Sequence, residues 1–175
     1  MATFLLLPDG TGTTSFHWVA SAGDRHECLD DDNGDVSYVQ CDNNNEAMII
    51  EYANPSVAEE DIGSIDSVRF ISSGRSEHRT SDALVNIKFE APTAGFIQLC
   101  AFDPHRTNHE TINGTSRTTS DGSNAWTYAN LEALEMKCTK YLTTGVRLGY
   151  LALEVTYTPA VAEVTDNSTF FGANF

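Results

Sequence analysis

The chain has 175 residues, 41% of them hydrophobic, and its 25 acidic and 10 basic side chains give a net charge of −15. This length is most simply one domain, large enough to bury about 70% of the surface that the unfolded chain exposes. No apolar run reaches the roughly 20 residues of a transmembrane helix, and the opening MATFLLLPDG lacks the basic segment of a signal peptide. We therefore expect synthesis in a cytoplasm without secretion through a cleaved signal.

The negative charge is concentrated in the first third of the chain. Residues 1–63 contain thirteen acidic residues and a single basic one, Arg25, whereas residues 64–158 contain ten acidic and nine basic residues. A solvated acidic face that aids solubility explains this simply. The alternative is a face turned outward on a crowded assembly or toward a basic partner. Nucleic-acid binding is disfavoured, because counterion release requires clustered Lys and Arg, and the chain has only three lysines.

Short strands are predicted through the first hundred residues, from β-branched, aromatic and alternating runs bounded by turn residues. Pro8-Asp9-Gly10 reads as a turn after the first strand, and Arg25–Leu29 as a helical turn. The last two strands of this region are expected to form a hairpin. The predicted strands are Thr3–Leu7, Thr14–Ala20, Val36–Cys41, Ala47–Tyr52, Ile65–Ile71, Ala83–Phe89 and Gly95–Phe102.

A long loop and one short helix follow. Residues 103–125 are rich in Thr, Ser, Asn, Asp and Gly and lack apolar periodicity, so they are predicted to form a loop. The helix is expected over about 129–136, with Thr127 as its N-cap. Its apolar side chains would face the core: Leu131, Leu134 and Met136.

The strand Val146–Thr158 is the most apolar segment of the chain, with charge only at Arg147 and Glu154. A strand of this composition is expected to be covered on both faces, in the middle of a sandwich. Many short strands, frequent turn signals and one small helix predict an all-β fold, an antiparallel β-sandwich of jelly-roll type. An immunoglobulin-like sandwich is the alternative. We expect a domain over residues 1–159 and a C-terminal tail or docking arm over residues 160–175.

Motifs for chemistry are weak. The run LDDDNGD resembles a calcium loop, but placing Gly34 at its sixth position puts Leu29 and Gln40 where carboxylates are needed. His105 and His109 have helical spacing in a segment predicted to be a loop, so metal binding there is disfavoured. His26 and Cys28 would lie side by side only on a strand. We therefore predict no catalytic residue, no cofactor and no metal site.

The cysteines give no sign of a zinc site, because no two of them are closely spaced. They are expected to be buried thiols, with a disulfide between Cys28 and Cys41 as the alternative in an oxidising compartment. The four residues are Cys28, Cys41, Cys100 and Cys138.

Two groups of aromatic residues need an explanation. Trp126 beside Tyr128 is predicted to plug the core between helix and sheet, with a sugar-stacking platform as the alternative. The tail contains Phe170, Phe171 and Phe175, and burial of each is worth about 2 kcal/mol. We expect these three to fold back on the domain or to dock onto a neighbouring subunit, and they are the predicted partner-docking residues.

The segments WTYANLEALEMKC and VRLGYLALEVTYTP resemble the C-terminal part of a group of tailed-bacteriophage virion proteins. That group has a Trp-Thr-aromatic-Ala turn, a short acidic helix, a loop and a last apolar strand ending in a Glu-Val-x-Tyr-type sequence. LLLPDG, HWV and DDDNGD resemble its N-terminal part, so the resemblance covers roughly residues 4–42 and 126–159. Here Cys138 and Lys140 stand in the helix-to-strand loop, where the group usually has Gly-rich sequence.

This resemblance implies a non-enzymatic virion structural protein, made in the host cytoplasm and carried on the capsid exterior. The expected role is a capsid decoration (cement) protein, a homotrimer that binds the major capsid protein and stabilises the shell. The alternative is an adhesion module of a head or tail fibre, binding host surface glycans through exposed aromatics and the loop 103–125. Neither role involves nucleic acid or a membrane.

Overall fold

Eleven strands, all paired antiparallel, form two sheets in the part of the chain described by the computed structural model. The described residues are 1–14, 17–33, 36–43, 45–76, 86–91, 97–102, 109–141 and 145–161. The strands are β1 (Ala2–Leu6), β2 (Pro8–Thr14), β3 (Trp18–Ala20), β4 (Val39–Cys41), β5 (Glu46–Tyr52), β6 (Ile62–Ser76), β7 (Asn86–Ala91), β8 (Ile97–Phe102), β9 (Glu110–Asn113), β10 (Glu135–Tyr141) and β11 (Val146–Pro159). The helices are α1 (Tyr128–Glu132) and two 3₁₀ turns, η1 (His26–Cys28) and η2 (Glu59–Asp61).

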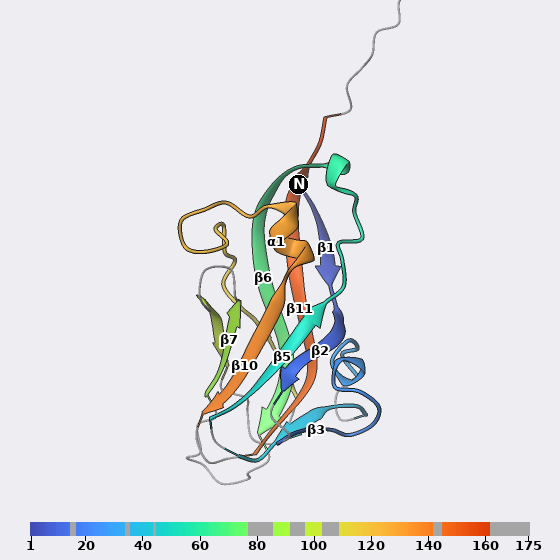
Figure 1. Ribbon diagram of the computed structural model, residues 1–175, viewed down its shortest axis with the longest axis vertical. Coiled ribbons are helices and arrows are strands. Elements are labelled where there is room, and N and C mark those ends of the chain that lie inside the picture. The colour runs from blue at the N-terminus through green and yellow to red at the C-terminus, as the bar shows by residue number, and fades with distance from the viewer. Residues whose placement is uncertain are drawn as a thin grey trace, which may run out of the picture.

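The first sheet, here called sheet A, has the order β3-β4-β11-β6-β9, with β1 also paired to β11. The second, sheet B, has the order β2-β5-β10-β7-β8. The chain passes from one sheet to the other at most of its connections, including β4 to β5, β5 to β6, β9 to β10 and β10 to β11. β5 and β10 cross in front of β6 and β11 in Figure 1. The predicted antiparallel β-sandwich of jelly-roll type is confirmed, as is the β7–β8 hairpin.

β11 is the central strand of sheet A, as its composition predicts. It pairs along its whole length with β6, and on its other side with β4 at its start and β1 at its end. The expectation that both faces of this strand are covered is wrong in part. Its outward side chains include three that are only half-buried: Arg147, Tyr150 and Glu154. Glu154 pairs with Arg69 of β6 at 2.8 Å. Polar side chains on this outer face therefore partner one another across strands.

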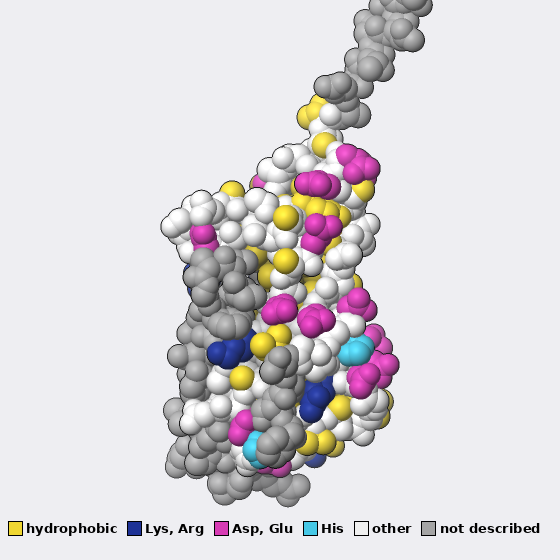
Figure 2. Space-filling view, viewed as in Figure 1, with side chains coloured by type: hydrophobic (Ala, Val, Ile, Leu, Met, Phe, Trp, Pro, Cys, Tyr) yellow, Lys and Arg dark blue, Asp and Glu magenta, His cyan; other side chains and the backbone are white. Residues whose placement is uncertain are grey.

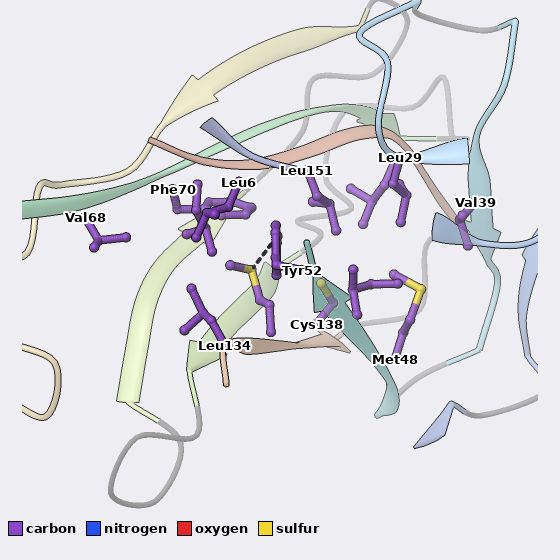
Figure 3. Close-up of a cluster of buried hydrophobic side chains, with 14 of the residues drawn as sticks. Leu6, Leu29, Val39, Met48, Tyr52, Val68, Phe70, Leu134, Cys138 and Leu151 are labelled. Atoms are coloured by element: carbon purple, nitrogen blue, oxygen red, sulfur yellow. Dashed lines mark hydrogen bonds between the residues drawn. The ribbon is translucent and has the colours of Figure 1, made fainter. Parts of the chain in front are cut away.

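The core lies between the two sheets. Figure 3 shows Leu6, Phe70 and Leu151 of sheet A directed toward Tyr52 and Cys138 of sheet B. The Tyr52 hydroxyl donates to the Met136 sulfur at 3.9 Å, and burial raises the pKa of Tyr52 well above its ordinary value. Such a core, filled mainly by aliphatic and aromatic side chains, supplies the main free energy of folding.

Helix α1 is shorter than predicted, and a strand follows where loop was expected. Thr127 caps the helix as predicted, with a reciprocal capping box to Asn130, and Leu131 and Leu134 are buried. Met136 is also buried, but in β10, whose inward side chains include Cys138 and Lys140. The period of two was hidden because a lysine occupies an inward position.

The other corrections concern edges and lengths. Pro8 begins β2, an edge strand of sheet B, instead of a turn, and a register irregularity follows between Pro8 and Gly10. Proline is tolerated there because an edge strand leaves amides unpaired. A Cβ at Gly10 would lie 2.7 Å from a Glu51 carboxylate oxygen, so a larger residue there would require this exposed side chain to move. β9 lies within the predicted loop 103–125, and β6 extends well beyond the predicted Ile65–Ile71.

The two ends of the sandwich differ in what they carry. The start of β1 and the end of β11 meet at one end, whereas β3 lies at the other (Figure 1). Among the described residues, the last hydrogen bond along the chain is donated by the amide of Ala160 to the Asp61 carbonyl, at 2.9 Å. We call this end the terminal pole and the end with β3 the distal pole. Across the described ranges, no helix is long and apolar enough to cross a membrane.

Candidate functional site

A groove of about 450 Å³ opens at the distal pole, beside β3 and β4. Its volume falls within the range of small-molecule sites, roughly 300–1,000 Å³. The lining combines an aromatic ring, aliphatic surface, amides, a carboxylate and an imidazole. The lining residues are His17, Val19, Ala20, Ser21, Tyr38, Gln40, Asp42 and Asn43.

Strand register brings these side chains together. Gln40 is paired with Val19 of β3 on one side and with Arg147 of β11 on the other. Their neighbours along each strand, Trp18 and Val39 among them, are buried in the core. Because side chains alternate along a strand, burial of one set presents the other on the outer face of sheet A. Val19 is 58% exposed there.

Arg147 fixes the aromatic wall of the groove. Its guanidinium carbon lies 4.1 Å from the centroid of the Tyr38 ring, a cation–π distance. Its Nε also donates to Oε1 of Gln40 at 3.2 Å. One planar group therefore holds both the ring and the amide in place.

Gln40 is held from its other end by Asp42. Its Nε2 donates to the two Asp42 carboxylate oxygens, at 3.1 and 3.2 Å. An ionised carboxylate has about four acceptor positions, so these contacts leave Asp42 able to accept from a ligand as well. A row of four side chains, each in contact with the next, is therefore in position before any ligand binds: Tyr38, Arg147, Gln40 and Asp42.

His17 also lines the groove. Its Nδ1 lies 2.8 Å from a Glu46 carboxylate oxygen, so Glu46 orients the imidazole ring. The carbonyl of Glu46 accepts from the indole N–H of the buried Trp18 at 3.1 Å. The groove wall is thereby attached to the hydrophobic core.

Lys140 supports the groove from inside the sandwich. It is completely buried, and its Nζ donates to the carbonyls of Asp42 and Asn43 at 3.0 and 2.8 Å. Desolvation lowers the pKa of this ammonium. Burial likewise raises the pKa of the nearby Cys41 thiol. The turn that carries the groove carboxylate is therefore fixed by an internal cation.

The residues singled out in the sequence mostly have structural roles. Trp126 is buried, and its indole N–H donates to the Arg117 carbonyl at 2.9 Å, so the core-plug prediction is confirmed. The Tyr128 hydroxyl donates to the Val57 carbonyl at 3.1 Å. A second hollow, of about 160 Å³, lies at the terminal pole between the segment Glu59–Ile65 and Trp126–Tyr128.

The histidines and cysteines are likewise separated. His26 lies in η1 with its Nδ1 3.4 Å from the Thr11 hydroxyl, and His109 has its Nδ1 3.4 Å from the Ser73 hydroxyl. Cys28 and Cys41 are buried free thiols, so no disulfide joins them. Among the described residues, no cluster of His, Cys, Asp or Glu could hold a metal ion. Gly34, His105 and the predicted docking residues Phe170, Phe171 and Phe175 lie outside the described residues.

The groove was missed by sequence reasoning. Tyr38, Gln40 and Asp42 do show a period of two that a search for polar alternation would find. Arg147 lies more than a hundred positions away, and only the β4–β11 register brings it to them. No local pattern contains that information.

No family model and no curated protein sequence matches this chain. Its fold is similar to that of two solved structures at 12% sequence identity. One is described as CBM4 (TM-score 0.42, covering 80% of this chain and 95% of the other). The second is the N-terminal cellulose-binding domain of Cellulomonas fimi β-1,4-glucanase C (TM-score 0.35, covering 82% and 89%). At this level of similarity the likeness carries no argument about what the present chain binds.

Proposed function

We propose that this protein is a non-enzymatic capsid decoration protein of a tailed bacteriophage, bound as a homotrimer to the major capsid protein on the exterior of the head. The sequence resemblance over roughly residues 4–42 and 126–159 is one support. The observation that carries the proposal is the geometry of the terminal pole. There β11 ends at Pro159 and the amide of Ala160 donates to the Asp61 carbonyl, so the described part of the chain ends at this pole, and the sequence that follows contains the three phenylalanines.

The acidic surface at this pole supports the same role. Glu59, Glu60 and Asp61 of η2 are exposed, as is Glu132 of α1. Figure 2 shows acidic side chains near the end from which the chain leaves. Together with the net charge of −15, they favour approach to a basic partner surface. The apolar tail would supply contact area, and the acidic rim would orient the encounter.

The test removes residues 160–175 and compares binding to bare capsids with that of the full chain. We expect the full protein to add stoichiometrically and to raise the temperature at which capsids disrupt. The truncated protein should keep its unfolding temperature and lose capsid binding. A variant with the three tail phenylalanines changed to serine is the finer version. Undiminished incorporation of both variants would refute a docking role for the tail, and absence of the protein from washed particles would refute the virion assignment.

Glycan adhesion is the second candidate, and the groove at the distal pole is the observation that favours it. The part of that hypothesis that relied on an exposed Trp126 is wrong, because this side chain is 4% exposed. The groove offers a different surface, beside β3 at the distal pole, whereas β11 ends at the terminal pole. The two roles are therefore compatible in one protein.

A further inference from the structure

We infer that the distal groove binds a neutral saccharide, with Tyr38 as the stacking surface and Gln40 and Asp42 as the hydroxyl-recognising groups. This rests on the adhesion candidate and is independent of the capsid-binding role.

The groove has the two kinds of surface that a sugar ring needs. A pyranose has an apolar C–H face and an edge of hydroxyl groups. The half-buried Tyr38 ring and the aliphatic side chain of Val19 provide apolar area. Amide and carboxylate groups stand beside them on the same outer face. A volume of about 450 Å³ suits a mono- or disaccharide.

The polar groups are positioned before any ligand arrives. Gln40 is restrained by Arg147 at one end and Asp42 at the other. The backbone beneath Asp42 is tied to Lys140. Restraint of this kind lowers the entropy lost when a ligand binds, because the side chains have little freedom left to lose. Asp42 already accepts from Gln40 and has further acceptor positions. It can therefore also accept hydrogen bonds from the hydroxyl groups of a sugar.

The charges favour a neutral ligand. Asp42 lines the groove, Glu46 pairs with the lining residue His17, and the net charge of the chain is −15. The cation of the site, Arg147, already contacts the Tyr38 ring and the Gln40 amide. An anionic sugar would meet a repulsive field and would have to displace these contacts. A neutral, hydroxyl-rich ring is not repelled, and it leaves these contacts in place when it stacks on the Tyr38 face turned away from Arg147.

The location fits a ligand presented from outside the particle. β11 runs from Leu148, beside the groove, to Pro159 at the terminal pole. Eleven residue steps at 3.3 Å span on the order of 36 Å. A protein held to a capsid by its terminal pole would therefore direct the groove away from the shell.

The test is a titration of the isotope-labelled full-length protein with neutral glycans, followed by NMR, beside a glycan array that includes sialylated and sulfated glycans. We expect a neutral ligand to shift the amides of residues 38–42 with millimolar to micromolar affinity. Asp42→Asn should weaken binding about three- to tenfold, because asparagine keeps an acceptor oxygen but makes a neutral hydrogen bond in place of a charge-assisted one. Tyr38→Ala should abolish measurable binding, and Tyr38→Phe should retain it.

Asp66→Asn is the matched control. Asp66 accepts from the Ser64 and Thr158 hydroxyls near the terminal pole, so its change should leave saccharide affinity intact. The spectrum of each variant shows whether it is folded, and Tyr38→Phe keeps the ring if Tyr38→Ala does not fold. The inference is overturned if no neutral glycan binds at 10-fold above millimolar concentration, or if only anionic glycans bind. It is equally overturned if Asp42→Asn and Asp66→Asn behave alike. Capsid binding by the same variants is measured separately, so either proposal can fail alone.

Discussion

Replacing Lys140 with methionine removes the internal cation beneath the groove while keeping a long unbranched side chain. The ammonium donates to two backbone carbonyls, at 3.0 and 2.8 Å, from a side chain with 0% exposure. A carbonyl left unpaired inside a protein costs about 1–3 kcal/mol. Water can reach the exposed turn of Asp42 and Asn43, and methionine relieves the desolvation of the ammonium. We therefore expect Lys140→Met to lower the free energy of unfolding by about 2 kcal/mol, which is the lower end of the range for two unpaired carbonyls.

For a chain of this length, 1 kcal/mol corresponds to about 2–4 °C, so Lys140→Met should lower the unfolding temperature by about 4–8 °C. Chemical denaturation followed by circular dichroism measures the same quantity independently. The control is Lys137→Met, on the same strand but only half-buried, where the change should stay within about 0.5 kcal/mol. An unchanged or raised stability of Lys140→Met would show that the buried ammonium costs as much as its hydrogen bonds return. The proposed support of the groove would then be wrong.

Three further predictions follow from single contacts. Burial raises the pKa of Cys138 far above its ordinary value. Iodoacetamide at mildly alkaline pH should therefore leave this thiol unmodified in the native protein and modify it after denaturation. Peptide mass spectrometry measures the modification, and rapid labelling of the native protein would contradict the prediction. Thr127→Ala removes the capping box of α1 and should cost about 1 kcal/mol, whereas Thr127→Ser should cost little, with both measured by thermal unfolding. The amides of Asn124 and Ser123, with the Asn124 side chain, hold the pKa of Asp121 below its ordinary value. A carboxyl whose pKa is depressed in the folded state stabilises the fold at pH above its unfolded pKa of 3.8, and this stabilisation is lost as the pH falls through the folded pKa. An NMR titration of Asp121 should therefore give a midpoint below 3.8. A midpoint at or above 3.8 would exclude these hydrogen bonds.

The scaffold could be read from the sequence wherever local composition and tertiary position agree. β11 combines an apolar run with a central place in sheet A, and Trp126 is a large ring adjoining a capped helix. The predictions were wrong where a residue type that usually marks one kind of structure occupies another. Pro8 and Gly10 mark a turn in most contexts, but here they occupy a bulged edge strand. The segment with Cys138 and Lys140 is expected to be a loop between the helix and the last strand, but it is strand β10, in which Lys140 is buried.

The candidate site could not be predicted, because its parts are joined only by long-range register. Gln40 and Arg147 face one another since β4 pairs with the first residues of β11. A shift of that pairing by one residue would turn Arg147 inward and destroy the row. The register is in turn set by the buried side chains between them, such as Val39 and Leu148. The candidate site is thus specified by the core sequence, which is the part of the chain in which we found no functional motif.

This dependence explains how one small sandwich could serve two partners at once. The terminal pole and the distal groove share β11 and the core packed against it, so both are rigidly positioned relative to one another. Changes in the outward residues of β4 alter only the groove, since their inward neighbours keep the register. Changes at the tail leave the paired strands untouched. A rigid central strand therefore lets the two surfaces vary independently in sequence while their separation and orientation stay fixed, as a protein anchored at one end and binding at the other requires.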